Sequence, residues 1–172
     1  MPHILHIVGC KNAGKTRACE LLIGPLHRQG LTVGTLKYTD HEGFDWDQPG
    51  KDTFRHREAG SDVTGIFGLR TFAFQFQSGD RPVVSIDDLA RTFYPSADLL
   101  LVEGYRLGSG PMLEVCRPGY SDRAVMPPEN LLATYGADLY PRGVPHFEYG
   151  AEDSLAAFIV QNLDRLHAPD QV

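Results

Sequence analysis

Residues 9–16 read Gly-Cys-Lys-Asn-Ala-Gly-Lys-Thr, which is the complete phosphate-binding pattern G-x-x-x-x-G-K-[ST]. Gly9 and Gly14 let the backbone turn tightly and approach phosphate oxygens, so that successive N–H groups form an anion-binding nest. Lys15 would place its charge on the β- and γ-phosphates, and the hydroxyl of Thr16 suits Mg²⁺. Such a loop requires a strand before it and a helix after it, because the anion sits at the helix N-terminus.

Both flanking elements are predicted by the sequence. Residues 4–8 form a short apolar, β-branched run that ends at Gly9, which is typical of a buried strand. After the loop, apolar residues recur at helical spacing and Gly30 supplies a stop. These apolar positions are Ala18, Leu21, Leu22 and Leu26. Motif and context together predict a site for a nucleoside triphosphate.

The rest of the chain alternates between strand and helix patterns. Strands are predicted at 31–36, 63–67, 71–77, 98–104, 113–117 and 131–135, and helices at 52–59, from 85 and at 154–167. This order predicts an α/β fold: a mostly parallel sheet of the P-loop NTPase type, with helices on both faces. We expect some antiparallel strands around 71–77 and 113–117. At 172 residues, a single nucleotide-binding domain over 1–172 is expected.

Two local patterns add detail. Ser85 and Asp88 are spaced as a capping box at the start of a helix. Phe72, Phe74 and Phe76 alternate along one strand, which predicts a half-buried strand with the rings in the core. On an edge strand, the same rings would instead serve a partner surface.

Composition narrows the partners. The formal net charge of −6 argues against a general binder of nucleic acid or of an anionic membrane. The three cysteines, Cys10, Cys19 and Cys116, form no C-x-x-C pair, which favours a reducing cytoplasm. The start of the chain lacks a signal-peptide pattern, and no apolar run reaches transmembrane length. We therefore expect a cytoplasmic protein.

In parallel sheets, ligands bind beyond the carboxyl ends of the strands. Glu103 ends the apolar run 99–102 and is the best second ligand for Mg²⁺. Lys37 ends another strand at the same edge and either neutralises a γ-phosphate or is simply solvated. Asp45 and Asp52 are candidates for a third carboxylate near the metal. Asp98 begins the Glu103 strand and therefore has a structural role at the far edge.

Four segments together give a resemblance to MobB, the family of molybdopterin-guanine dinucleotide biosynthesis adaptors. They are 9–16, 37–41, 45–60 and 98–105, of which 45–60 is the most specific. The resemblance implies a homodimeric GTP binder of weak GTPase activity that assists a MobA-type nucleotidyltransferase in attaching GMP to molybdopterin. It also implies that residues 37–60 line the partner side or the pterin side.

The resemblance and the motif together give a set of expected contacts. The cofactors are GTP and Mg²⁺. The nucleotide contacts are Gly9, Cys10, Lys11, Asn12, Ala13, Gly14, Lys15, Thr16, Arg17, Lys37 and Asp138. The metal ligands are Thr16, Glu103, Asp45 and Asp52, and catalysis rests on Lys15 and Glu103. No N-K-x-D guanine motif is present, and Asp138 is placed by position alone to accept from guanine N1–H and its 2-amino group.

A second hypothesis is an ATP-dependent kinase or ligase acting on a small metabolite. It requires an acceptor pocket and arginines that clamp phosphate, for which Arg55, Arg57 and Arg106 are candidates. The chain contains no arginine-rich lid segment, which counts against this reading.

Overall fold

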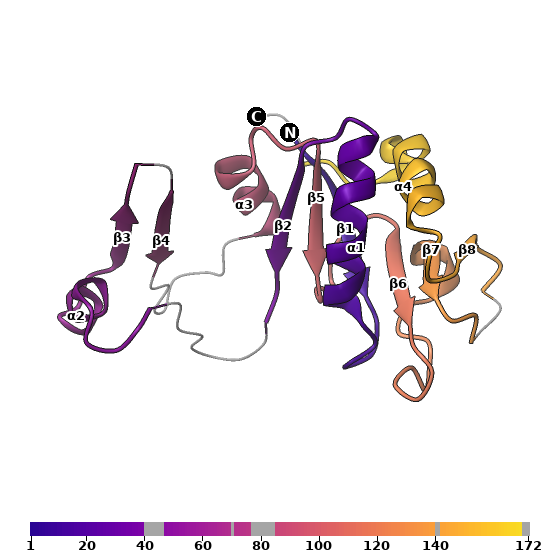
Figure 1. The fold of residues 1–172 in the computed structure, drawn as a ribbon, viewed down its shortest axis with the longest axis horizontal. Helices are drawn as coiled ribbons and strands as arrows, with labels where there is room; N and C mark the ends of the chain where they lie inside the picture. The colour runs from indigo at the N-terminus through magenta and orange to yellow at the C-terminus, as the bar shows by residue number, and fades with distance from the viewer. Residues whose placement is uncertain (40–46, 70, 77–84, 140–141, 170–172) are drawn as a thin grey trace. The chain divides into compact units, whose positions relative to one another are not determined.

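In a computed structural model, which describes residues 1–39, 47–69, 71–76, 85–139 and 142–169, the chain divides into two compact units (Figure 1). One unit comprises residues 1–39 and 85–172, and the other comprises residues 40–84. That residues 1–172 act as one nucleotide-binding domain stays a prediction.

The larger unit is built on a six-stranded sheet in the order β2-β5-β1-β6-β7-β8, in which every neighbouring pair is parallel. The strands are β1 His3–Val8, β2 Val33–Lys37, β5 Leu99–Glu103, β6 Met112–Cys116, β7 Leu131–Gly136 and β8 His146–Phe147. The predicted α/β class is confirmed. The antiparallel direction predicted around 113–117 is wrong, because β6 lies between β1 and β7 and runs parallel to both. Among the strands of the described ranges, the two-residue β8 is the one that the sequence does not predict.

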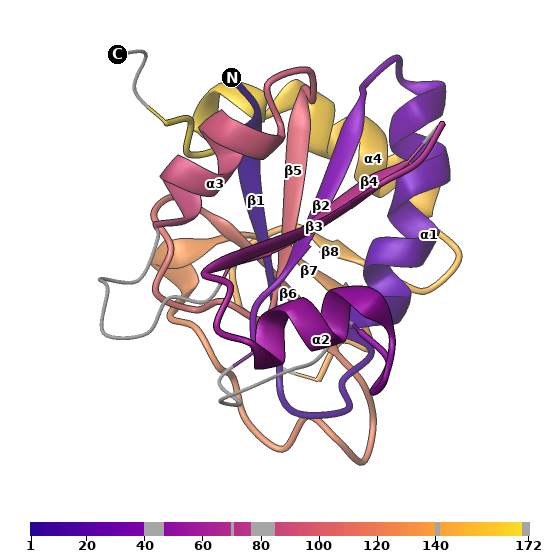
Figure 2. The same cartoon turned by 90° about the vertical axis from the view of Figure 1, so that its left-hand side faces the viewer.

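Helices cover both faces of this sheet, as predicted (Figure 2). Side chains of a strand alternate between the two faces. Leu5 and Ile7 of β1 pack with α1 Lys15–Arg28 and α4 Glu152–Gln161, while Ile4 packs with α3 Ile86–Phe93 on the other face. Two short 3₁₀ turns, Pro128–Asn130 and Leu163–Arg165, complete the unit.

The C-terminal helix is shorter than predicted. Periodic apolar residues favoured a helix over 154–167, but α4 ends at Gln161. Asn162 follows it, and its side-chain amide donates to the carbonyl of Phe158 at 2.8 Å, so the side chain takes up a backbone acceptor at the helix end. Among the helices of the described ranges, none has the length and apolarity needed to cross a bilayer.

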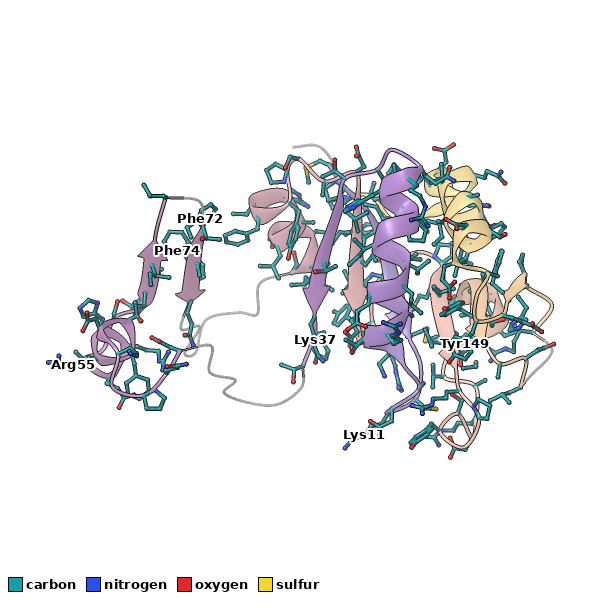
Figure 3. The ribbon with its side chains drawn as sticks, viewed as in Figure 1. Lys11, Lys37, Arg55, Phe72, Phe74 and Tyr149 are labelled. Atoms are coloured by element: carbon teal, nitrogen blue, oxygen red, sulfur yellow. The ribbon has the colours of Figure 1, made fainter. Side chains whose placement is uncertain are left out.

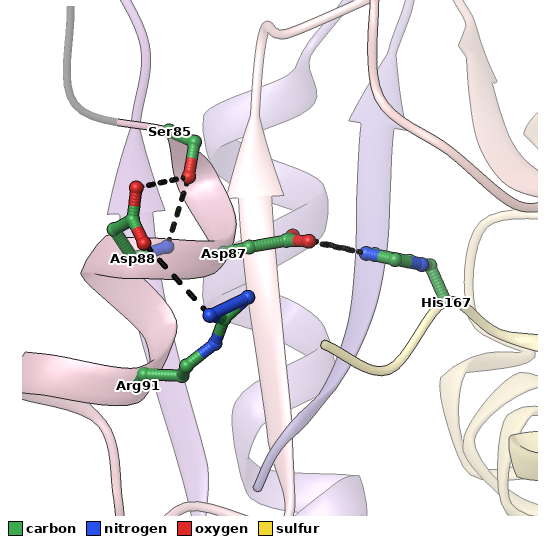
Figure 4. A network of polar contacts seen from close by, with 5 residues as sticks. All are labelled: Ser85, Asp87, Asp88, Arg91 and His167. Carbon is green, nitrogen blue, oxygen red and sulfur yellow. Dashed lines mark hydrogen bonds and ion pairs between the residues drawn. The ribbon is translucent and has the colours of Figure 1, made fainter. Parts of the chain in front are cut away.

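Polar contacts fix α3 and the C-terminal segment (Figure 4). Ser85 is the N-cap of α3 and accepts from the backbone N–H of Asp88, which confirms the predicted cap. Asp87 contacts His167 Nε2 at 2.9 Å. The carbonyl of His167 accepts from the backbone N–H of Ile4 at 2.7 Å, so the end of the chain is tied to both α3 and β1.

The smaller unit contains α2 Asp52–Glu58 and an antiparallel hairpin of β3 Val63–Phe67 and β4 Phe72–Phe76. The antiparallel strand predicted at 71–77 is thus confirmed. Arg57 of α2 donates to the side chain of Gln75 at 2.7 Å, so α2 lies on the Gln75 face of β4. Successive side chains of a strand point to opposite faces, so the phenylalanines of β4 lie on the other one.

That second face of the hairpin carries the three phenylalanines. Phe72, Phe74 and Phe76 are 68%, 55% and 58% exposed, so the prediction that they lie in a core is wrong. The ring of Phe74 lies over Gly65, where an added Cβ would be only 2.5 Å from the ring. The alternation identified one distinct face of the strand, but could not say what covers it. We call the face formed by Phe72, Phe74 and Phe76 the aromatic face.

Candidate phosphate and metal site

The turn between β1 and α1 has the backbone geometry that its glycines allow. Gly9 has φ of 153° and Gly14 has φ of 96°, both in the region that favours glycine. A Cβ at Gly9 would lie 2.6 Å from the carbonyl oxygen of Val115 on β6, so no larger residue fits there. Gly14 is the N-cap of α1 and makes no side-chain cap bond. The first N–H groups of α1 therefore have no capping side chain between them and an arriving anion.

Lys15 lies folded over this loop. Its Nζ donates to the carbonyls of Cys10 at 2.8 Å and Gly9 at 3.2 Å. Burial lowers the pKa of the Lys15 ammonium, and the charge of Glu103 acts in the opposite direction. The ammonium thus lies against the loop that would hold phosphate.

Arg106, which the sequence indicates only as one of three possible phosphate clamps of a kinase or ligase, is a second cation on the loop. Its NH2 group donates to the carbonyl of Gly9 at 2.9 Å, and its charge contributes to lowering the pKa of Lys15. The sequence places Arg106 shortly after Glu103, just beyond the end of β5. The register of β5 on β1, with Glu103 opposite Ile7, carries Arg106 to the loop.

Three predicted residues meet at the ends of β2, β5 and α1. The hydroxyl of Thr16 donates to Glu103 Oε1 at 2.7 Å, and Lys37 Nζ lies 3.6 Å from the same oxygen. The register pairs Lys37 with Glu103 across adjacent parallel strands. The Glu103 side chain is only 13% exposed, whereas that of Lys37 is 67% exposed. Asp98, at the opposite end of β5, accepts from the backbone N–H of Thr32 at 2.7 Å, which is a structural contact.

The pair formed by Thr16 and Glu103 fits a magnesium ion. Mg²⁺ prefers oxygen ligands and commonly takes one or two from protein, with water and phosphate supplying the rest. A hydroxyl and a carboxylate beside a phosphate loop meet that requirement. Within the described residues, no group of three or more His, Cys, Asp or Glu side chains is arranged to hold a metal by itself. We therefore expect water and phosphate oxygens to complete the coordination of a magnesium ion held by this pair.

A cavity of about 200 Å³ adjoins this pair, between α1 and β2. Its polar lining includes Thr16, Lys37 and Glu103, and its apolar lining includes Ile23 and Leu101. The cavity offers room beside the metal position for part of a second molecule.

The remaining predicted contacts lie at the same edge of the sheet, in the smaller unit, or outside the described residues. Lys11 and Asn12 are exposed at the tip of the loop, and buried Ala13 closes its turn by donating to the carbonyl of Cys10 at 3.2 Å. Arg17 pairs with Glu20 at 3.0 Å along α1.

Three acidic candidates remain. Asp138 is exposed just after β7, at the same edge of the sheet as the loop. Asp45 lies outside the described residues, and Asp52 begins α2 in the smaller unit. A metal role for Asp45 and Asp52 stays a prediction. Tyr149, which no sequence motif indicates, lies at the same end of the sheet as Lys37 and Lys11 (Figure 3).

Comparisons with known proteins point to one family. The model of the MobB family, molybdopterin guanine dinucleotide synthesis protein B, matches residues 4–136. The molybdopterin-guanine dinucleotide biosynthesis adapter protein of Escherichia coli is 30% identical over 130 residues, which are 75% of this chain and 71% of that protein. The Haemophilus influenzae adapter is 35% identical over 104 residues, covering 60% of this chain and 57% of that protein. The crystal structure of Bacillus subtilis MobB is 25% identical with a TM-score of 0.67, and the match covers 96% of this chain and 99% of that one.

Proposed function

Because this chain belongs to the MobB family of molybdopterin-guanine dinucleotide biosynthesis adapter proteins, we propose that it is an adapter that binds GTP with Mg²⁺ and hydrolyses it slowly. The observation that carries the nucleotide part of the proposal is the contact of Thr16 with Glu103 beside the loop of Gly9 and Lys15. It joins an anion nest, a cation and a pair of metal ligands in one place.

Each side chain has a distinct role in this proposal. The loop N–H groups and Lys15 bind the β- and γ-phosphates, while Thr16 and Glu103 hold magnesium. Lys37 and Arg106 add positive charge at the γ-phosphate end. When bound, magnesium would neutralise charge on the phosphate oxygens.

The local contacts of Glu103 support slow hydrolysis. Its carboxylate accepts from Thr16 and lies 3.6 Å from Lys37. Both contacts occupy the carboxylate, so we do not expect it to act as a general base toward an attacking water. Slow turnover suits an adapter whose nucleotide state, rather than its product, is read by a partner.

Guanine preference is assigned to Asp138. A carboxylate there can accept from both N1–H and the 2-amino group of guanine, whereas adenine offers no matching pair of donors. Asp138 is exposed and follows β7. In the sheet, β7 lies beside β6, and β6 lies beside β1, the strand that precedes the loop.

The proposed partners follow from the family and from the hairpin. We assign a second copy of the chain to the aromatic face, because a two-stranded hairpin with one large apolar face gains stability by covering it. A MobA-type nucleotidyltransferase is the proposed enzyme that the adapter assists, with molybdopterin as a candidate contact. A cytoplasmic location is part of the proposal.

The direct test is calorimetry with GTP, ATP and GDP, with and without Mg²⁺. We expect GTP to bind in the micromolar range and more tightly than ATP. Mg²⁺ should strengthen the binding of GTP. Lys15→Ala should abolish binding without unfolding the protein, because it removes the cation that serves the phosphates. Arg28→Ala is the matched control, since it removes a cation at the opposite end of α1, where Arg28 pairs with Asp153. Unchanged GTP affinity in Lys15→Ala would refute the assignment.

The cavity beside Glu103 keeps one alternative open to experiment, namely an ATP-dependent kinase or ligase. Its volume would admit part of an acceptor next to the γ-phosphate. Mass spectrometry of small metabolites incubated with ATP and the protein would detect a phosphorylated or ligated product. Formation of such a product with a turnover of order 10 s⁻¹, typical of efficient enzymes, would favour this alternative over an adapter.

A further inference from the structure

Tyr149 lies beside the segment that carries Asp138. It follows β8 in the turn before α4, and its hydroxyl donates to the carbonyl of Cys116 at the end of β6 at 3.2 Å. The same carbonyl accepts from the backbone N–H of Ala137 at 3.0 Å. Tyr149 and the residue before Asp138 therefore share one acceptor, which places the ring next to the Asp138 segment.

Two glycines lie close to this ring. A Cβ at Gly136 would lie 3.0 Å from both Cζ and the hydroxyl oxygen of Tyr149, so the ring occupies the space that a side chain at position 136 would take. A Cβ at Gly14, the N-cap of α1, would lie 3.9 Å from the same hydroxyl. The hydroxyl end of the ring thus lies near both the end of β7 and the start of α1, where the loop would place the phosphates.

The scaffold holds the ring in place while leaving it accessible. Tyr135, which is fully buried, meets Tyr149 edge-on with ring centroids 5.2 Å apart. The hydroxyl of Tyr135 donates to Glu152 at 2.5 Å, and Glu152 also accepts from the N–H of Gly150 at 2.9 Å, which pins the turn that carries Tyr149. Tyr149 itself is 49% exposed. A fixed ring with an open side loses little conformational entropy when a ligand stacks on it.

We propose that the exposed side of the Tyr149 ring is the stacking surface for the purine base of the nucleotide, with Asp138 at the edge of that base. The inference rests on the proposed nucleotide function and names the part of the site that binds the nucleoside. Aromatic rings bind the face of any base, so Tyr149 supplies affinity and Asp138 supplies the choice of guanine.

The experiment compares two ligands and two variants. The ligands are GTP, which has a base, and inorganic tripolyphosphate, which does not, each titrated by calorimetry in the presence of Mg²⁺. Tyr149→Leu removes the ring, and Tyr149→Phe keeps the ring but loses the bond to Cys116. We expect Tyr149→Leu to weaken GTP binding by about tenfold and to leave tripolyphosphate binding unchanged. Tyr149→Phe should bind GTP with nearly wild-type affinity.

The outcomes separate this inference from the proposed function. If wild-type protein binds neither GTP nor tripolyphosphate, the nucleotide function itself is wrong, and the inference with it. If wild-type protein binds GTP but Tyr149→Leu binds it equally well, only the stacking surface is wrong. An equal loss for both ligands in Tyr149→Leu, or a tenfold loss of GTP affinity in Tyr149→Phe, would also overturn stacking, because either shows a role in holding the loop or the turn.

Discussion

Thr16 and Glu103 are separated by 87 residues in sequence, yet the hydroxyl of one donates to the carboxylate of the other at 2.7 Å. The contact exists because β5 pairs with β1, and α1 begins directly after the loop that follows β1. One residue supplies a neutral oxygen and the other a charged oxygen on the same side of the loop. A substitution in this pair should therefore change how strongly nucleotide binding depends on magnesium.

Replacing Glu103 by Gln should reduce the effect of magnesium on GTP binding. The amide keeps the size of the side chain but removes its charge, so we expect the gain in affinity on adding Mg²⁺ to fall by about tenfold. Affinity measured in EDTA should change little. Titrations of GTP with and without Mg²⁺ give both values.

Asp98→Asn is the matched control, because it changes a carboxylate at the opposite end of the same strand. It should lower thermal stability through its contact with Thr32 and leave the magnesium effect intact. An undiminished magnesium effect in Glu103→Gln would assign the metal to other residues.

Arg106→Ala should lower the rate of GTP hydrolysis more than it lowers GTP affinity. A guanidinium beside the loop can stabilise charge on the transferring phosphoryl group, and arginines in such positions raise rates by large factors. Removing one should reduce the single-turnover rate by at least about tenfold. Arg106→Lys should recover only part of the rate, because an ammonium cannot make two parallel hydrogen bonds. A rate equal to wild type in Arg106→Ala would limit Arg106 to a structural contact with Gly9.

The buried imidazole of His6 predicts a pH-dependent stability. Burial, with a smaller effect from His167 and an opposing one from Asp87, lowers the pKa of His6 from 6.5 to about 4. Between these values the unfolded chain binds more protons than the folded one, so the free energy of unfolding falls as the pH drops through this window. The loss contributed by His6 is about 3 kcal/mol from pH 6.5 to pH 4.

Urea unfolding at several pH values checks this prediction. In His6→Gln, which has no titrating group at this position, the slope of stability against pH between 4 and 6.5 should be smaller than in wild type. The comparison of slopes is informative even though the substitution itself lowers stability. Equal slopes would show that His6 does not titrate in that window.

Substituting the aromatic face should dissociate the proposed homodimer. The double variant Phe72→Ser with Phe76→Ser removes two exposed rings, each of which would contribute about 1.5–3 kcal/mol when buried. Sedimentation equilibrium should show a dimer for wild type and a dissociation constant raised by at least about tenfold for the variant. Leu107→Ser, which changes an 84% exposed apolar residue of the larger unit, should leave the dimer intact. An unchanged dimer in the double variant would place the interface elsewhere.

The sequence predicts those parts of the fold that local patterns determine. The strand and helix around the glycine loop, the cap at Ser85 and the position of Glu103 at the end of β5 are each specified within a few residues, and the structure has these elements as predicted. The family resemblance is confirmed as well. What the patterns leave open is set by partners that are distant in sequence.

The direction of β6 illustrates this limit, because an apolar run predicts a strand without saying which way its neighbours run. The same holds for Phe72, Phe74 and Phe76, whose alternation is compatible with a core or with a surface. Arg106 could be named only as one of several candidate arginines, and Tyr149 not at all, because their contacts with Gly9 and with Cys116 are made across the sheet.

The carbonyl oxygen of Gly9 links two cations of the site. It accepts from both Lys15 and Arg106, so the two cations share one anchor before any anion arrives. A phosphate that attracts one of them relieves crowding of positive charge for the other. Changes at these two positions should therefore be thermodynamically coupled. The change in the free energy of nucleotide binding in the double variant should differ from the sum of the changes in the two single variants. The size of that difference would report how strongly the two cations depend on each other when phosphate oxygens replace the Gly9 carbonyl.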